Sequence, residues 1–145
     1  VAGGAVLLVD YGYPRHEYYH PQRAMGTLLC HYRHRAHDDP LWLPGLQDIT
    51  AFVDFSAAAD AAAAAGLDVL GYNTQAHFLM GAGITRLVEE VAGAGSDADV
   101  AAVNQQAKTL IMPQGMGERF KVLAVGRGCD APLAGFSLVD QRHKL

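Results

Sequence analysis

The alternation of apolar and polar positions predicts strands and helices that follow one another along the chain. Residues 5–9 (AVLLV) form a continuous apolar run, which is typical of a strand buried on both faces in the centre of an α/β sheet. Residues 57–65 are rich in alanine, the best helix former, and predict a helix. Either Asp54 or Ser56 can cap the start of this helix, and Gly66 can end it.

The second half of the chain continues the pattern with strands that flank a group of helices. Ser96 and Asp99 have the spacing of a capping box, and Pro113 predicts the end of that helix near residue 112. Gly81 and Gly83 interrupt the helical pattern before it. We expect a strand at 67–72, helices at 74–80, 85–91 and 96–112, and a strand at 119–125. The helices leave enough chain for these two strands to pair as antiparallel neighbours.

Two stretches lack a clear period. Residues 13–45 hold five of the seven His, four of the six Tyr and the only Trp, with one short strand or helical turn expected near 27–29. Ordered loops of this length in compact domains are usually functional, so we expect an insertion or lid. Residues 128–145 also show no period and predict a mobile or loosely docked tail.

Composition narrows the functional classes. The length of 145 residues fits one domain. Lys and Arg total 11 against 15 Asp and Glu, and this acidic balance disfavours nucleic-acid binding. The longest apolar run is too short to cross a bilayer. Cys30 and Cys129 form neither a disulfide framework nor a CxxC pair, which favours a reducing compartment.

Because VAGG leads directly into the first strand without an initiator Met, we expect a carboxy-terminal segment of a longer protein.

The end of the first strand is the most informative candidate site. Asp10, Tyr11 and Gly12 follow the apolar run, and open α/β sheets bind ligands at the carboxyl ends of their strands. A carboxylate beside a glycine that permits close backbone approach suits such a site. The alternative is an ordinary turn at a strand end. Asp48 and Thr50 lie in an alternating stretch, where a sheet-edge turn is again the alternative.

The sequence gives less support to a metal site, a phosphate-binding loop or a catalytic triad. His31, His34 and His37 lie near Asp38 and Asp39, but on a helix only adjacent pairs of these histidines would share one face. We predict a polar pocket wall or partner surface there and no metal. The glycine pairs at 81–83 and 93–95 lack the arrangement of a phosphate loop, and no serine has the context of a catalytic triad.

Ten short strings occur in a specific order along residues 3–126. They are GAVLLVDYG (4–12), GTL (26–28), HR (34–35), PG (44–45), DIT (48–50), VDF (53–55), TQ (74–75), FL (78–79), GI (83–84) and MGERFKVL (116–123). Together they resemble the carboxy-terminal part of one family, the MidA family of class I S-adenosylmethionine-dependent methyltransferases. This family includes a protein arginine methyltransferase linked to the assembly of respiratory complex I.

The resemblance implies the distal half of a Rossmann-like, mixed α/β sheet. Its strands 5, 6 and 7 would lie at 5–9, 67–72 and 119–125, with the seventh inserted antiparallel between the other two. Residues 1–127 would form the carboxy-terminal part of a methyltransferase domain, with 13–45 as a His- and Tyr-rich insertion or lid and 128–145 as the tail.

The resemblance also implies how the cofactor is bound. The family's glycine-rich cofactor loop and its acidic ribose ligand would lie upstream, and no residue here matches them. S-adenosylmethionine would therefore be bound mainly by residues upstream of this chain and by none within it. The segment alone would be inactive and, if expressed alone, could self-associate through the exposed edge of its first strand.

For the acceptor, the resemblance implies a protein arginine, with a complex I subunit as one candidate. A carboxylate orients a guanidinium well, so Asp10 is the candidate catalytic residue. The candidate substrate-binding residues are Tyr11, Gly12, His34, Asp48 and Thr50. The expected location is the cytoplasm of a bacterium or the mitochondrial matrix of a eukaryote. Two alternatives are a non-catalytic module that binds a partner through 13–45, and a methyltransferase with another acceptor.

Overall fold

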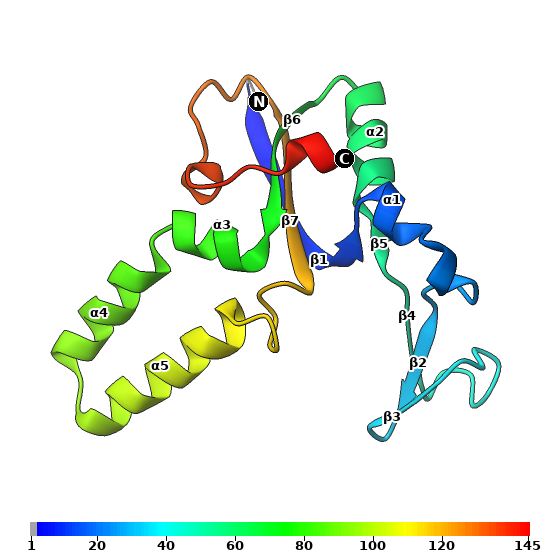
Figure 1. The fold of residues 1–145 in the computed structure, drawn as a ribbon, viewed down its shortest axis with the longest axis horizontal. Coiled ribbons are helices and arrows are strands. Elements are labelled where there is room, and N and C mark those ends of the chain that lie inside the picture. Colours follow the sequence, from blue (N-terminus) through cyan, green and yellow to red (C-terminus); the bar gives the residue numbers. More distant parts are fainter. Residues whose placement is uncertain (1–2) are drawn as a thin grey trace.

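The computed structural model describes residues 3–145 as a mixed α/β fold with two sheets (Figure 1). Val1 and Ala2, where the expected domain begins, lie outside the described residues. The main sheet has the order β5-β1-β7-β6 and consists of β1 (Gly4–Tyr13), β5 (Val53–Asp54), β6 (Asp68–Thr74) and β7 (Phe120–Arg127). A smaller sheet has the order β3-β2-β4 and consists of β2 (Leu29–Tyr32), β3 (Arg35–His37) and β4 (Asp48–Thr50).

Strand β7 lies between β1 and β6 and is antiparallel to both. Leu123 of β7 is opposite Leu8 on one side and Tyr72 on the other. The expected antiparallel pairing of the last two strands is therefore confirmed. Because β1 and β6 both run opposite to β7, they are parallel to each other and end at the same edge of the sheet.

Helix α2 (Phe55–Ala64) covers one face of the main sheet. Its residues Phe55 and Ala59 pack with buried side chains of β6 and β7. Of the two expected caps, the structure uses Asp54, whose Oδ1 accepts a hydrogen bond from the Ala57 N–H at 3.0 Å. Gly66 follows the helix with φ 75°, the left-handed conformation expected of a helix stop.

Three further helices follow β6, and they are α3 (Gln75–Gly81), α4 (Ile84–Ala94) and α5 (Asp97–Ile111). Helices α4 and α5 project from the sheet (Figure 1). Gly83, at φ 90°, separates α3 from α4, as the glycine spacing predicted. Helix α4 is longer than expected and continues through Gly93. Ser96 and Asp99 form the predicted capping box of α5.

The stretch 13–45 is more regular than expected. It contains α1 (Arg15–Tyr18), a 3-10 turn and the hairpin formed by β2 and β3. Arg33 and His34, with φ 48° and 63°, form the two-residue hairpin turn. Such turns require positive φ at both central positions and usually contain Asn or Gly, so this sequence carries no ordinary hairpin signal.

Strand β1 differs from the expected buried central strand. Along Gly4–Tyr11 only the edge facing β7 is paired, because β5 pairs with β1 only at Gly12 and Tyr13. Within residues 3–145 its apolar side chains therefore remain 41–53% exposed, and these are Val6, Leu7, Leu8 and Val9.

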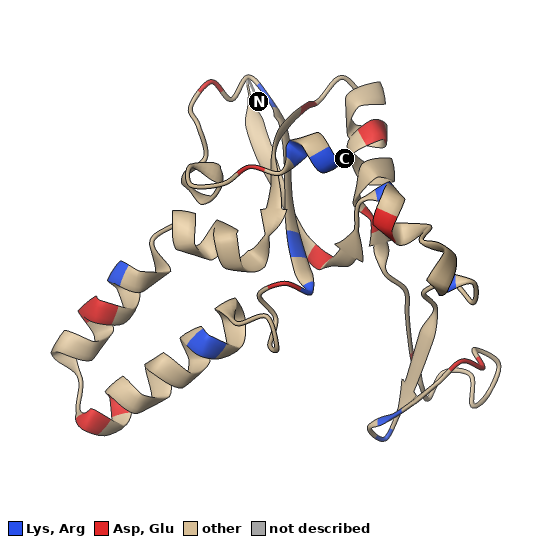
Figure 2. Cartoon of the chain, viewed as in Figure 1, with Lys and Arg blue, Asp and Glu red and all other residues tan. Residues whose placement is uncertain are grey.

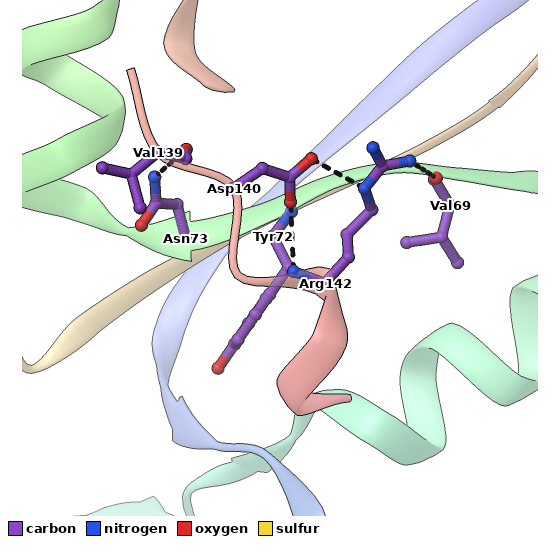
Figure 3. A network of polar contacts seen from close by, with 6 residues as sticks. All are labelled: Val69, Tyr72, Asn73, Val139, Asp140 and Arg142. Atoms are coloured by element: carbon purple, nitrogen blue, oxygen red, sulfur yellow. Dashed lines mark hydrogen bonds and ion pairs between the residues drawn. The ribbon is translucent and has the colours of Figure 1, made fainter. Parts of the chain in front are cut away.

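Residues 128–145 also differ from the expected loosely docked tail, because they pack along β6 (Figure 3). The Gln141 N–H donates to the Tyr72 carbonyl at 2.7 Å, and Arg142 Nη1 donates to the Val69 carbonyl at 2.9 Å. Phe136 is buried against β7. Short 3-10 turns carry these contacts, and such turns produce no helical or strand period in a sequence.

Candidate functional site

The candidate site begins where β1 ends. Because β1 and β6 are parallel, the segment from Asp10 to Tyr13 lies at the same sheet edge as Thr74, the last residue of β6. This edge holds the carboxyl ends of the parallel strands, where open α/β sheets bind ligands.

Asp10 is half-buried at this edge. Its Oδ1 accepts a hydrogen bond from the Tyr11 N–H at 2.8 Å, which fixes the carboxylate close to the strand. In the β1–β7 register Asp10 is opposite Lys121, and opposite residues of an antiparallel pair share one face of the sheet. Asp10 and Lys121 thus lie on the same face of the sheet, but no ion pair joins their side chains within residues 3–145.

Tyr11 and Gly12 hold the strand end in place. The Tyr11 ring packs edge-on against Phe52 and Phe120, with both centroid distances at 5.6 Å, so it belongs to an aromatic cluster. Gly12 is buried, and a Cβ there would lie 2.2 Å from the Val53 carbonyl oxygen. A residue with a side chain would push β5 away from β1.

A cavity of about 110 Å³ lies beside this strand end. It is lined by α1, the ends of β6 and β7, and the carboxy-terminal segment, through Pro14, Glu17, Tyr72, Thr74, Glu118, Lys121, Gln141 and Lys144. The Tyr72 side chain is 1% exposed, and its hydroxyl has no hydrogen-bond partner within residues 3–145. Burial, together with the nearby Glu17 carboxylate, raises the pKa of this hydroxyl.

Lys121 enters the same cavity from β7. Its Nζ donates to the Glu118 carbonyl oxygen, and the residue is only 8% exposed. Burial lowers the pKa of Lys121, and the charges of Glu118 and Glu17 oppose this shift. Neither Lys121 nor Tyr72 was among the site residues predicted from the sequence. The available signal was a single charged residue within the otherwise apolar strand FKVLAV.

Tyr13 extends the polar region beyond the cavity. The Arg23 guanidinium lies 4.0 Å from the centroid of the Tyr13 ring, and Lys121 Nζ lies 5.7 Å from it. The Arg23 guanidinium also donates to the Glu17 carbonyl oxygen. Basic and aromatic groups therefore surround the end of β1, and Figure 2 shows acidic and basic residues interspersed over the described chain.

The remaining candidate residues lie in the smaller sheet. His34 is exposed in the hairpin turn, Asp48 is exposed opposite His31, and Thr50 Oγ1 donates to the Leu29 carbonyl at 3.0 Å. No hydrogen bond or ion pair among residues 3–145 joins these three residues to the end of β1. The structure therefore forms two separate groups, and Figure 1 shows the smaller sheet projecting from the main one.

The histidines of the smaller sheet do not converge. His31 is opposite Ala36, and His37 is opposite Cys30. Over the described residues 3–145, no three His, Cys, Asp or Glu side chains gather closely enough to bind a metal ion. In the same range, no helix has both the length and the apolar character needed to cross a membrane.

A family model described as "Putative S-adenosyl-L-methionine-dependent methyltransferase" matches residues 1–73, half of the chain. The chain belongs to this methyltransferase family. It is also 35% identical over 123 residues to "Protein arginine methyltransferase NDUFAF7, mitochondrial" of Danio rerio, and 36% identical over 124 residues to the protein of that name from Rattus norvegicus. These alignments cover 85% of this chain but only 27% and 26% of the relatives. The chain thus spans about a quarter of the length of the curated relatives it matches.

Two crystal structures from Burkholderia thailandensis share this fold at 52% identity. An uncharacterized superfamily protein matches with a TM-score of 0.93, covering 99% of this chain and 38% of that chain. A second superfamily member, bound to S-adenosyl-homocysteine, matches with a TM-score of 0.91, covering 98% and 36%. The resemblance to MidA-like methyltransferases is confirmed, as is S-adenosylmethionine as the cofactor of the family.

No glycine-rich loop connects a strand to a helix at the carboxyl edge of the sheet in residues 3–145. The cavity beside Tyr72, at about 110 Å³, is also smaller than the several hundred Å³ typical of pockets for larger ligands.

Proposed function

We propose that this chain is the acceptor-side part of an S-adenosylmethionine-dependent methyltransferase that modifies an arginine of a protein. The match to a structure holding S-adenosyl-homocysteine, over 98% of this chain, is the observation that carries the proposal. The names of the Danio and Rattus relatives support arginine as the acceptor. We further propose a complex I subunit as a candidate substrate, in the mitochondrial matrix or, for a bacterial protein, in the cytoplasm. The word "mitochondrial" in both names is consistent with the first location.

The geometry at the end of β1 suits a guanidinium acceptor. Asp10 has one carboxylate oxygen engaged by the Tyr11 N–H, and its Oδ2 forms no hydrogen bond within residues 3–145. A carboxylate oxygen can hold a guanidinium by a charge-assisted hydrogen bond and receive the proton that the methylated nitrogen releases. Tyr11 and Gly12 position this carboxylate. His34, Asp48 and Thr50 would contact the acceptor protein from the smaller sheet.

We also propose that the main sheet continues beyond the free edge of β1, and that the cofactor site lies on that continuation. The exposed apolar side chains of β1 support this arrangement, since a strand apolar on both faces is stable when neighbours cover it. Strands β1, β6 and β7 would then be strands 5, 6 and 7 of the complete sheet. Residues 1–145 alone should bind no S-adenosylmethionine in calorimetry, whereas the longer protein should bind it.

The replacement Asp10→Asn in the full-length protein tests the acceptor role. Methyl transfer from labelled S-adenosylmethionine to arginine in a cell extract, followed by mass spectrometry, should fall about 100-fold, because the amide cannot accept the proton. The melting temperature should not change. Asp130→Asn, in an exposed loop, is the matched control.

Unchanged transfer in Asp10→Asn would remove Asp10 from the mechanism. Label found on a different side chain or on a small molecule would contradict arginine as the acceptor and leave the methyltransferase assignment in place.

A further inference from the structure

We propose that the cavity between β6, β7 and the carboxy-terminal segment is a binding site for a carboxylate group, held at its buried end by Tyr72 and Lys121. This site is distinct from Asp10 and does not depend on methyl transfer. Two kinds of ligand carry such a carboxylate: a free small carboxylate, and an acidic side chain of a protein partner.

Tyr72 provides the first reason. Its hydroxyl lines the cavity at a depth where the side chain is 1% exposed, yet it has no partner among the described residues. A buried hydroxyl without a hydrogen bond has lost its hydration without compensation, so a group that accepts a hydrogen bond from it is expected in the cavity. Because burial raises the pKa of Tyr72, the hydroxyl remains protonated and acts as a donor.

Lys121 provides a second donor at the same buried end. An ammonium has three N–H groups, and within residues 3–145 the only acceptor for the Lys121 ammonium is the Glu118 carbonyl. The residue is 92% buried, so water reaches its remaining donors poorly. A carboxylate has two acceptor oxygens and a negative charge, and it can satisfy Tyr72 and Lys121 together.

The charges around the cavity are arranged by depth. Glu17 and Glu118 line the cavity too, but the Glu17 side chain is 43% exposed and Glu118 is exposed, so both carboxylates keep contact with water. The buried end therefore offers donors, and the acidic groups lie toward solvent. Lys144 adds a second ammonium to the lining, and its positive charge also lowers the pKa of Lys121.

The carboxy-terminal segment closes the cavity. Asp140 Oδ1 accepts from the Tyr72 N–H at 3.3 Å and Oδ2 pairs with Arg142 at 2.7 Å, which fixes the segment on β6 (Figure 3). This anchoring brings Gln141 and Lys144 to the cavity wall. The volume of about 110 Å³ exceeds that needed for one water molecule and suits a group of a few heavy atoms.

The test is a titration of the full-length protein with acetate at constant ionic strength, followed by the relaxation of the acetate methyl signal in NMR. The expected result is saturable binding in the millimolar range. Tyr72→Phe, which keeps the ring and removes only the hydroxyl, should weaken binding about fivefold, and Lys121→Met about tenfold or more. Lys108→Met and Tyr19→Phe change exposed residues of the same types and should leave binding unchanged.

A second arm separates the two sources. The peptide acetyl-Gly-Asp-Gly-amide, compared with its Asn counterpart, should bind more tightly than acetate if the site takes acidic side chains, and more weakly if it takes free carboxylates. Acetate that does not saturate, or binding that is equal in the wild type and Tyr72→Phe, would overturn the proposal. Tyr72→Phe carries the test should Lys121→Met fold poorly.

Discussion

Gly12 determines how closely β5 can approach β1. It is opposite Val53 in the parallel pair, and any Cβ would clash with the Val53 carbonyl and with the Phe55 ring at 2.9 Å. Phe55 belongs to the buried core, so this position links the candidate site to the packing of α2.

Gly12→Ala should therefore lower the free energy of unfolding by about 1–3 kcal/mol, the usual cost of overpacking. Urea unfolding followed by circular dichroism measures this change. Gly4→Ala is a matched control on the same strand, because a Cβ there meets nothing within 4 Å. Equal stability of Gly12→Ala and Gly4→Ala would show that β5 can move away from β1 at no cost.

Local chemistry explains which residues could be predicted. Asp54, Gly66 and the Ser96–Asp99 pair act within a few positions of their own helix ends, so the sequence alone predicted their roles. Tyr72 and Lys121 meet only through the pairing of β6 with β7, and their cavity also needs the carboxy-terminal segment. Such a site depends on contacts between residues far apart in the chain, and local sequence patterns do not predict these contacts. The catalytic role of Asp10 stays a prediction.

Among the elements, those with a strong period were predicted and those without one were not. The alanine-rich α2 and the capped α5 formed within a few residues of their expected bounds. Strands β2 and β3 have only four and three residues, and their turn at Arg33 and His34 lacks the Asn or Gly that marks such hairpins. Tertiary contacts rather than local preference account for these short strands.

The carboxy-terminal segment is held by buried contacts, and Phe136 is the main one. It is 8% exposed, packs edge-on against Phe78 with centroids 5.2 Å apart, and fills the space beside Gly71, where a Cβ would lie 2.4 Å from its ring.

Phe136→Ala should lower the free energy of unfolding by about 3 kcal/mol, because it leaves a cavity in the core. Thermal and urea unfolding measure the loss, and hydrogen exchange should show faster exchange at Gln141, whose N–H is bonded to Tyr72. Leu138→Ala is the control, since Leu138 is 64% exposed. A loss no larger than in the control would mean that the segment is loosely docked after all.

At the scale of the whole molecule, the dominant feature is the edge of β1 that has no partner strand along Gly4–Tyr11 within residues 3–145. Exposed strand edges with apolar side chains pair readily with other chains, and charged residues on such edges prevent this. Leu7 and Val9 are 49% and 51% exposed, and they lie two positions apart on one face of the strand.

Residues 1–145 expressed alone should therefore self-associate, and the double replacement of Leu7 and Val9 by Lys should reduce the association. Light scattering as a function of concentration measures the association, and Leu41→Lys, at an 81% exposed position between β3 and β4, is the control. In the full-length protein, the same double replacement should be destabilising. If a continued sheet covers β1 there, the two buried charges should lower the free energy of unfolding by more than about 2 kcal/mol. Two results together would contradict a covered β1: residues 1–145 remain monomeric, and the double replacement leaves the stability of the full-length protein unchanged. The strand would then be stable as an open edge.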